Sequence, residues 1–236
     1  NPEYCGAQPA DCLRTPLNGS DILDVITAHT ADIGIVTLAP ELEGALDLIA
    51  WLTGRGIRVS LGHSGASCDV ARAAMAAGAS QATHLFNRMP PLHHRDPGLA
   101  GAVLQNPDVV AELICDGVHV HPAMVQVAVA AKTPARVMAI SDGTSVAGVP
   151  EGSTGALGGR RITSTTRCAV LGDGTMAGSV LTMDAAFRQL TGPMGFSLVD
   201  AATMCATTPA RQLGLAGQGR IAEGACADLV VLDRSH

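Results

Sequence analysis

Three features of this 236-residue sequence predict an α/β fold. In the predicted fold, helices cover a buried parallel sheet that forms an incomplete (β/α)8 barrel. Short apolar runs alternate with Ala- and Leu-rich stretches of helical period, as in repeated strand–helix units. Hydrophobic residues make up 47% of the chain but aromatic residues only 2%, so small aliphatic side chains must fill the core. The first run is not followed by a GxGxxG sequence, which favours the barrel over a doubly wound nucleotide-binding sheet.

Five apolar runs are the predicted strands, at residues 33–39, 58–62, 81–85, 110–115 and 136–141. The helices predicted between them span residues 41–55, 68–77 and 121–132, and three more are predicted at 182–192, 197–206 and 208–213. Gly56 and Gly78 follow the first two helices and Pro134 follows the third, as expected of helix stop signals. A complete barrel has eight such units, so the five predicted here form part of one.

The sequence predicts two domains of very different size. Residues 1–210 form the barrel portion, with about the last five βα units and the C-terminal helices. Within it, residues 1–20 are irregular and residues 151–174 form short Gly-rich segments. A last strand at residues 227–233 follows helices instead of another βα unit, so residues 211–236 are predicted to be the C-terminal segment of a small β-sandwich domain.

Composition and charge exclude several classes of protein. The net charge of −6, with no cluster of Lys and Arg, argues against a nucleic-acid partner. No apolar run approaches the ~18 residues needed to cross a membrane, and no secretory leader is recognisable. The seven cysteines include no CxxC pair, so reduced thiols are expected. These features predict a soluble cytoplasmic protein.

Polar residues at the ends of four predicted strands indicate a catalytic site. His63, His84, Asp116 and Asp142 each come directly after an apolar run or close it, and the carboxyl ends of barrel strands form the active-site face. Two histidines and an aspartate can hold a divalent metal ion and leave a position open for water. Strand-end histidines can also be structural hydrogen-bonding residues, and the pattern alone leaves that alternative open.

Several motifs resemble the amidohydrolase superfamily and, within it, the N-acetylglucosamine-6-phosphate deacetylase family. They include Gly62-His-Ser-Gly-Ala66, Thr83-His-Leu-Phe-Asn-Arg-Met-Pro90, Asp96-Pro-Gly-Leu-Ala-Gly101 and Ser141-Asp142. The second and third together are specific to the deacetylases, whereas residues 219–230 are typical of amidohydrolases in general. The resemblance extends from residue 1 to about residue 233.

The resemblance implies a metal-dependent deacetylation. His63 and His84 match the family's metal-binding histidines, for which Zn²⁺ is the expected ion and Fe²⁺ or another divalent ion the alternative. Asp142 matches the aspartate that takes a proton from metal-activated water and delivers it to the departing amine. The implied products are glucosamine 6-phosphate and acetate.

The resemblance also implies how the phosphosugar is bound. Asn87 and Arg88, through backbone N–H groups of their loop, and Arg95, through its guanidinium, match the family's phosphate-binding region. Arg95 is expected to reach the site of a neighbouring subunit, which implies a homodimer. His119 is expected to contact a sugar hydroxyl or the phosphate, and Met176 lies in a loop that closes over the substrate.

Other polar residues match no catalytic role in this resemblance. Glu41 is expected to be structural and Glu43 to be a helix-surface charge, while His93, His94 and His121 are expected on the surface. The family's metal-binding glutamate and carbonyl-polarising histidine belong to motifs that precede the first residue here. Two alternatives therefore remain: a catalytically inactive fragment or scaffold, and a different amidohydrolase resembling dihydroorotase.

Overall fold

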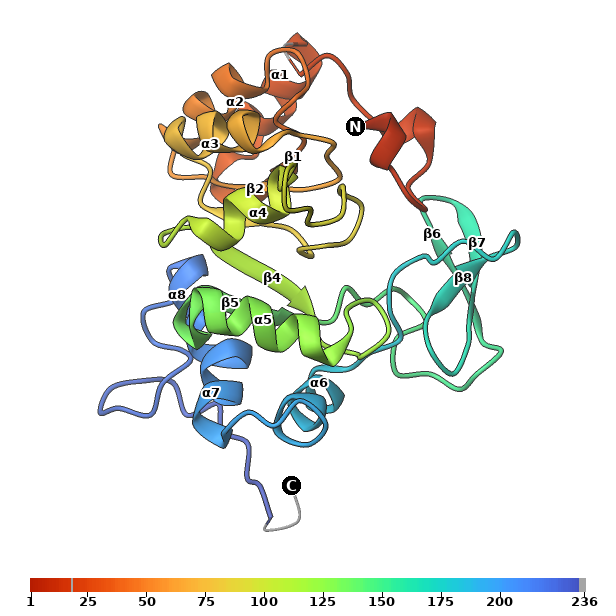
Figure 1. Cartoon of the computed structure of the whole chain (residues 1–236), viewed down its shortest axis with the longest axis vertical. Coiled ribbons are helices and arrows are strands. Elements are labelled where there is room, and N and C mark those ends of the chain that lie inside the picture. The colour runs from red at the N-terminus through yellow and green to blue at the C-terminus, as the bar shows by residue number, and fades with distance from the viewer. Residues whose placement is uncertain (18, 234–236) are drawn as a thin grey trace.

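A five-stranded parallel sheet forms the centre of the computed structural model, which describes residues 1–17 and 19–233. Its strands follow the chain in spatial order, β1-β2-β3-β4-β5, and every neighbouring pair is parallel. They are β1 (Ile35–Leu38), β2 (Arg58–Leu61), β3 (Gln81–Ala82), β4 (Val110–Ile114) and β5 (Val137–Ile140). Consecutive parallel strands joined by helices are the arrangement of a (β/α)8 barrel, so the five predicted units are confirmed as part of one (Figure 1).

Four helices connect these strands and cover one face of the sheet (Figure 1). They are α2 (Ala45–Thr53), α3 (Cys68–Ala76), α4 (Gly98–Gln105) and α5 (Pro122–Lys132), and α1 (Ser20–Ala28) precedes them. The helix predicted at residues 41–55 is shorter than expected. Gly44, at φ 81°, closes a turn, and α2 begins only at the next residue. The sequence pattern did not single out α4, an apolar helix whose residues are mostly buried.

The core lies between this sheet and its helices. Alternate strand residues face the helices, as Ala111 and Leu113 of β4 do, and both are fully buried. Glu112 lies between them and faces the other side, where the amide of Gln81 donates a hydrogen bond to its carboxylate at 3.2 Å. Burial raises the pKa of Glu112 to about 7, although the N–H of His84 and the Gln81 amide partly offset that effect. The face of the sheet opposite the helices therefore carries a buried polar pair, Glu112 and Gln81.

A second, antiparallel sheet occupies a region where the sequence predicted only short Gly-rich segments. It comprises β6 (Thr154–Leu157), β7 (Arg160–Ser164) and β8 (Ala169–Leu171), and lies beside the N-terminal segment (Figure 1). Gly158 and Gly159 turn β6 into β7 with φ of 54° and 80°, a turn that favours glycine. Ile162 anchors a small separate core that includes Ala7.

The C-terminal helices agree with prediction, but the last predicted strand is wrong. Helix α6 (Met183–Thr191) is followed by α7 (Leu198–Ala202), a π-helical turn and α8 (Thr208–Leu213). Residues 227–233 are irregular, and Val231 is 94% exposed. A strand is stabilised by pairing across a ladder, and neither sheet of the described chain includes a strand from this stretch. The proposed domain division at residue 210 remains a prediction.

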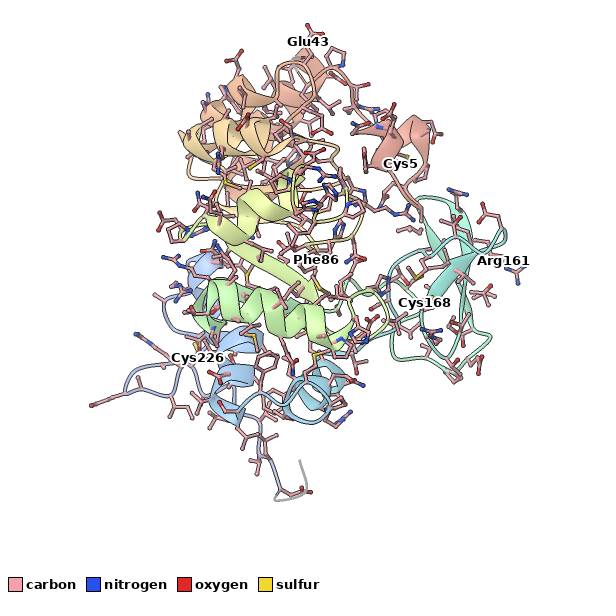
Figure 2. All side chains as sticks on the ribbon, in the orientation of Figure 1. Cys5, Glu43, Phe86, Arg161, Cys168 and Cys226 are labelled. Atoms are coloured by element: carbon pink, nitrogen blue, oxygen red, sulfur yellow. The ribbon has the colours of Figure 1, made fainter. Side chains whose placement is uncertain are left out.

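Among the described residues, none of the helices has both the length and the hydropathy that crossing a bilayer requires. All seven cysteines are free thiols, as the sequence predicted. In Figure 2, Cys168 and Cys226 lie on different parts of the molecule, the first near the antiparallel sheet and the second beside the C-terminal helices.

We expect Glu112→Gln to flatten the pH dependence of stability. The folded chain holds the Glu112 proton up to pH 7, whereas an unperturbed glutamate loses it near 4.5. Unfolding therefore releases a proton at pH values between these two pKa values. As the pH rises through this window, the free energy of unfolding falls by up to about 3 kcal/mol in total. Urea unfolding at several pH values across the window should show this fall in the wild-type chain and in exposed Glu43→Gln, but not in Glu112→Gln. Equal slopes in all three would refute the assignment.

Candidate metal and substrate site

A cavity of about 210 Å³ lies at the carboxyl ends of the parallel strands. Seven of the eight predicted site residues line it: His63, His84, Asn87, Arg88, His119, Asp142 and Met176. They come from loops that follow β2, β3, β4, β5 and β8, so the folded sheet brings together residues more than a hundred positions apart. The eighth, Arg95, is exposed in the loop before α4 and is not among the lining residues.

The two predicted metal ligands face each other. The Nε2 atoms of His63 and His84 are 2.9 Å apart, and their rings meet edge to face at 4.7 Å between centroids. Nitrogen ligands that are each ~2.0–2.1 Å from one ion lie roughly 3 Å apart. The separation of the two imidazoles therefore suits a shared divalent ion.

Hydrogen bonding and burial prepare both histidines for metal binding. The Nδ1 of His63 is 2.8 Å from the carbonyl oxygen of Tyr4; since a carbonyl only accepts, Nδ1 carries the proton and Nε2 keeps its lone pair. Burial lowers the pKa of His63, with a further contribution from His84. Burial also lowers the pKa of His84. Both rings are thus neutral at neutral pH, the form that binds metal.

The backbone at these positions is held in the left-handed region. His63, His84, Arg88 and Asp142 have φ of 48°, 32°, 51° and 45°, and Phe86 has 78°. Among the described non-glycine residues only Thr133 shares this property. Such conformations cost on the order of 1–3 kcal/mol each and cluster at functional sites. The strain marks the loops after β2, β3 and β5 as parts of one site.

Asp142 stands directly after β5 on the wall of the cavity. Its carbonyl oxygen accepts a hydrogen bond from the N–H of Ser179 at 2.9 Å, and a Cβ added to Gly178 would lie 2.8 Å from that same oxygen. Desolvation by its surroundings raises the pKa of Asp142 although the residue is partly open to solvent, while His119 and His63 oppose the increase. A carboxylate with a raised pKa is a stronger base than an unperturbed aspartate, which suits a group that accepts a proton.

His119 is held by a carboxylate that sequence reasoning did not assign. The Nδ1 of His119 is 2.6 Å from Oδ2 of Asp116, and both side chains are more than nine-tenths buried. Oδ1 of Asp116 accepts the N–H groups of Val118 and His119, each at 2.8 Å. Burial alone would raise the pKa of Asp116, but these hydrogen bonds bring it below its usual value. The anionic carboxylate therefore fixes the His119 ring at the cavity wall.

The loop after β3 differs from expectation in one respect. The N–H of Asn87 donates to the carbonyl of His84 at 2.9 Å, so it closes a turn and does not face a ligand. The side-chain amide of Asn87 donates to the carbonyls of His84 and Leu85 at 3.3 and 3.4 Å. Arg88 is the cation of this loop that lines the cavity, and it passes so close to Gly6 that an added Cβ would meet its Nε at 2.5 Å.

Sequence reasoning missed the residues that close the cavity from the other side. Cys5 and Gln8 come from the N-terminal segment, and Ala156 and Leu157 from the end of β6. Figure 2 shows Cys5 on that segment and Phe86 in the loop after β3. The Gly158-Gly159 pair is a hairpin signal that could have revealed β6 and β7, but no local signal places this hairpin beside the metal ligands.

The three histidines of unassigned role lie on the surface as expected, whereas Glu43 is exposed in the turn before α2 and not on a helix. Glu43, His93, His94 and His121 are exposed, and Figure 2 shows Glu43 at the outer end of the molecule near α1 and α2. His121 instead caps α5, because its Nδ1 accepts the N–H of Ala123 at 3.2 Å.

Parallel strands of barrel type, with paired histidines and a carboxylate at their carboxyl ends, are the arrangement found in metal-dependent hydrolases. Residues 5–236 match the model of the Amidohydrolase family, and the chain belongs to that family. It is 38% identical over 235 residues to the N-acetylglucosamine-6-phosphate deacetylase of Lysinibacillus sphaericus, covering 98% of this chain and 59% of that protein. It is also 38% identical over 234 residues to the N-acetylgalactosamine-6-phosphate deacetylase of Escherichia coli O157:H7, covering 98% and 61%.

Solved structures of similar proteins share the fold. A mutant N-acetyl-D-glucosamine-6-phosphate deacetylase from Mycobacterium smegmatis, in complex with N-acetyl-D-glucosamine-6-phosphate, superposes with a TM-score of 0.93 at 38% identity, covering 99% of this chain and 62% of that one. The corresponding enzyme from Thermotoga maritima gives 0.89 at 35% identity, covering 98% and 62%. The chain thus spans about three-fifths of the length of the relatives it matches.

Membership of this family implies a divalent metal cofactor. The site fits such an ion because the two Nε2 atoms converge at 2.9 Å and both rings are held neutral by burial. The described residues contain no group of three or more His, Cys, Asp or Glu side chains placed to hold an ion. The paired Nε2 atoms of His63 and His84 could hold such an ion together with further ligands.

Asp116→Ala is expected to destabilise the fold by about 2 kcal/mol or more. The substitution leaves the Nδ1 of His119 and two N–H groups buried without their acceptor. Asp173→Ala is a matched control, because Asp173 accepts one N–H, that of Thr175, in an exposed turn. Urea unfolding should show a clearly larger loss for Asp116→Ala, and equal losses would mean that the Asp116–His119 contact contributes no net stability.

Proposed function

We propose that this chain carries the metal- and substrate-binding part of an enzyme that hydrolyses N-acetylglucosamine 6-phosphate to glucosamine 6-phosphate and acetate. The observation that carries the proposal is the convergence, in one cavity, of seven residues that motif resemblance had selected. Relatives at 36–38% identity named N-acetylglucosamine-6-phosphate deacetylase support the choice of substrate. The proposed location is the cytoplasm.

In this proposal His63 and His84 hold a divalent ion, for which we propose Zn²⁺ ahead of Fe²⁺. When bound, such an ion acts as a Lewis acid on water and on the acetamide carbonyl. The neutral imidazoles supply lone pairs at Nε2, and the Tyr4 carbonyl keeps His63 in the required tautomer.

Asp142 moves the proton that the reaction requires. Its carboxylate faces the cavity beside His63, where it can accept a proton from the attacking water. It then delivers that proton to the nitrogen of the departing sugar amine, since an amide anion is a very poor leaving group. The raised pKa favours this second step, because a more basic carboxylate holds the proton until the C–N bond breaks.

The remaining lining residues orient the sugar phosphate. Arg88 provides a planar cation suited to a phosphate dianion, and His119, held by Asp116, presents Nε2 toward the cavity for a hydroxyl or phosphate oxygen. Asn87 shapes the loop on which Arg88 stands, and Met176 forms the rim. Arg95, exposed and outside the lining, is proposed to serve a neighbouring subunit in a homodimer.

Two alternatives to this proposal can be distinguished by measuring which sugar phosphate binds and whether acetate is released. The similarity to an N-acetylgalactosamine-6-phosphate deacetylase favours the epimeric sugar as a second candidate substrate. An inactive chain that binds the phosphosugar and serves as a scaffold would share the cavity and its cation. Both sugars should therefore be assayed side by side for binding and for acetate release.

Asp142→Asn is expected to reduce acetate release from N-acetylglucosamine 6-phosphate by about 10²–10⁴-fold. The variant keeps the shape of the side chain, so the Kd for the phosphosugar should stay within about threefold of wild type. Asp173→Asn, at an exposed carboxylate, is the control and should turn over at the wild-type rate. Measurement is by coupled acetate assay and calorimetric binding on the Zn²⁺-loaded chain. Binding without turnover by the wild-type chain would instead favour the scaffold.

Arg88→Lys is expected to weaken binding of N-acetylglucosamine 6-phosphate by roughly tenfold or more, because a point charge replaces a planar fork of donors. Binding of unphosphorylated N-acetylglucosamine should not change. Arg161→Lys, at an exposed position that Figure 2 shows on the antiparallel sheet, provides the control. An equal loss for both sugars would contradict the assignment of Arg88 to the phosphate.

A further inference from the structure

Glu41, which follows β1, accepts hydrogen bonds from three separate groups. Its Oε2 accepts the hydroxyl of Ser64 at 2.7 Å, and its Oε1 accepts the N–H of Gly65 at 2.6 Å and the side-chain amide of Asn1 at 2.8 Å. Ser64 is fully buried. Hydrogen bonds to a carboxylate are about twice as strong as those between neutral groups, so Glu41 is a firm anchor for the two residues that follow His63.

The same network joins the loops of both histidines. The hydroxyl of Ser64, which donates to Glu41, accepts the N–H of Ala66 at 3.0 Å. The backbone N–H of Ser64 donates to the carbonyl of Arg88 at 3.1 Å, in the loop that begins at His84. Glu41 thus links β1, the loop after β2 and the loop after β3 through a single buried serine.

This anchor acts where the backbone is strained. His63 has φ 48°, a conformation that persists only when its surroundings enforce it. The ring of Tyr4 covers Gly65 so closely that an added Cβ would lie 2.6 Å from it, and the carbonyl of Tyr4 meets the His63 imidazole. The His63 side chain is therefore held from one side by Tyr4, and its loop from the other by Glu41.

We propose that Glu41 is a positioning residue of the metal centre: it holds residues 63–66 in the conformation that points Nε2 of His63 toward Nε2 of His84. Both carboxylate oxygens are engaged by donors, so Glu41 acts through the loop and does not bind the ion. The inference rests on the metal site of the proposed function and adds to that site a residue outside the cavity lining.

Metal affinity of the full chain tests the inference without relying on turnover. We expect Glu41→Ala to raise the Kd for Co²⁺ by about 10- to 100-fold, as loss of an outer-shell partner does, with the absorption spectrum at saturation unchanged. Glu41→Gln keeps the size of the side chain and one carbonyl acceptor, so its Kd should lie between those of wild type and Glu41→Ala. Glu43→Gln, an exposed neighbour, should bind as wild type does.

A second readout uses the metal-free chain. Long-range ¹H–¹⁵N spectra of wild type should show a single His63 tautomer protonated at Nδ1, and Glu41→Gln should show a mixture while circular dichroism confirms an intact fold. Wild-type affinity and a single tautomer in both Glu41 variants would overturn the inference. A changed Co²⁺ spectrum at saturation would also overturn it, since Glu41 would then be a ligand.

His63→Ala separates this inference from the proposed site itself. If His63→Ala weakens Co²⁺ binding but the Glu41 variants do not, the metal site stands and the positioning role fails. If His63→Ala binds Co²⁺ as tightly as wild type, the metal site fails and the positioning role fails with it.

Discussion

The hydrogen-bonded register of the parallel ladder is the constraint on which the site depends. Leu38 pairs with Leu61, Leu61 with Ala82, and Ala82 with Ala111, so successive strands end at one edge of the sheet. Every residue that follows a strand end is therefore delivered to the same face. A shift of one residue in any strand would turn its side chains to the opposite face and separate the two histidines.

At that edge the chain must leave the strands by sharp turns, and the cost appears as strained backbone at the functional residues. Two of the strained segments are anchored by hydrogen bonds: Glu41 holds the loop of His63, and Ser179 holds the carbonyl of Asp142. Asp116 similarly orders the turn that carries His119. Charge-assisted hydrogen bonds donated to the carboxylates of Glu41 and Asp116 thus order two of the loops around the cavity.

The far wall of the cavity depends on contacts between distant parts of the chain. Arg160 of β7 donates to the carbonyl of Ala7 at 3.3 Å, and Ala7 is buried in the small core of the antiparallel sheet. Pro9 lies close beneath the Gly158 turn. The N-terminal segment and the β6–β7 hairpin therefore support each other, and both must be in place for Cys5 and Leu157 to line the cavity with His63 and His84.

The sequence by itself determined the strand–helix alternation, because apolar periodicity and glycine stop signals act within a few residues. It also selected His63, His84 and Asp142 as candidate site residues, because residue types at strand ends and motif resemblance are local properties. It could not show that the β6–β7–β8 sheet forms a wall of the cavity or that Asp116 holds the His119 ring. Nor could it show that Glu41 accepts hydrogen bonds from the loop of His63. Only the tertiary structure decided these three features. Each depends on hydrogen bonds and packing between segments that are distant in the chain, or on burial that composition does not reveal.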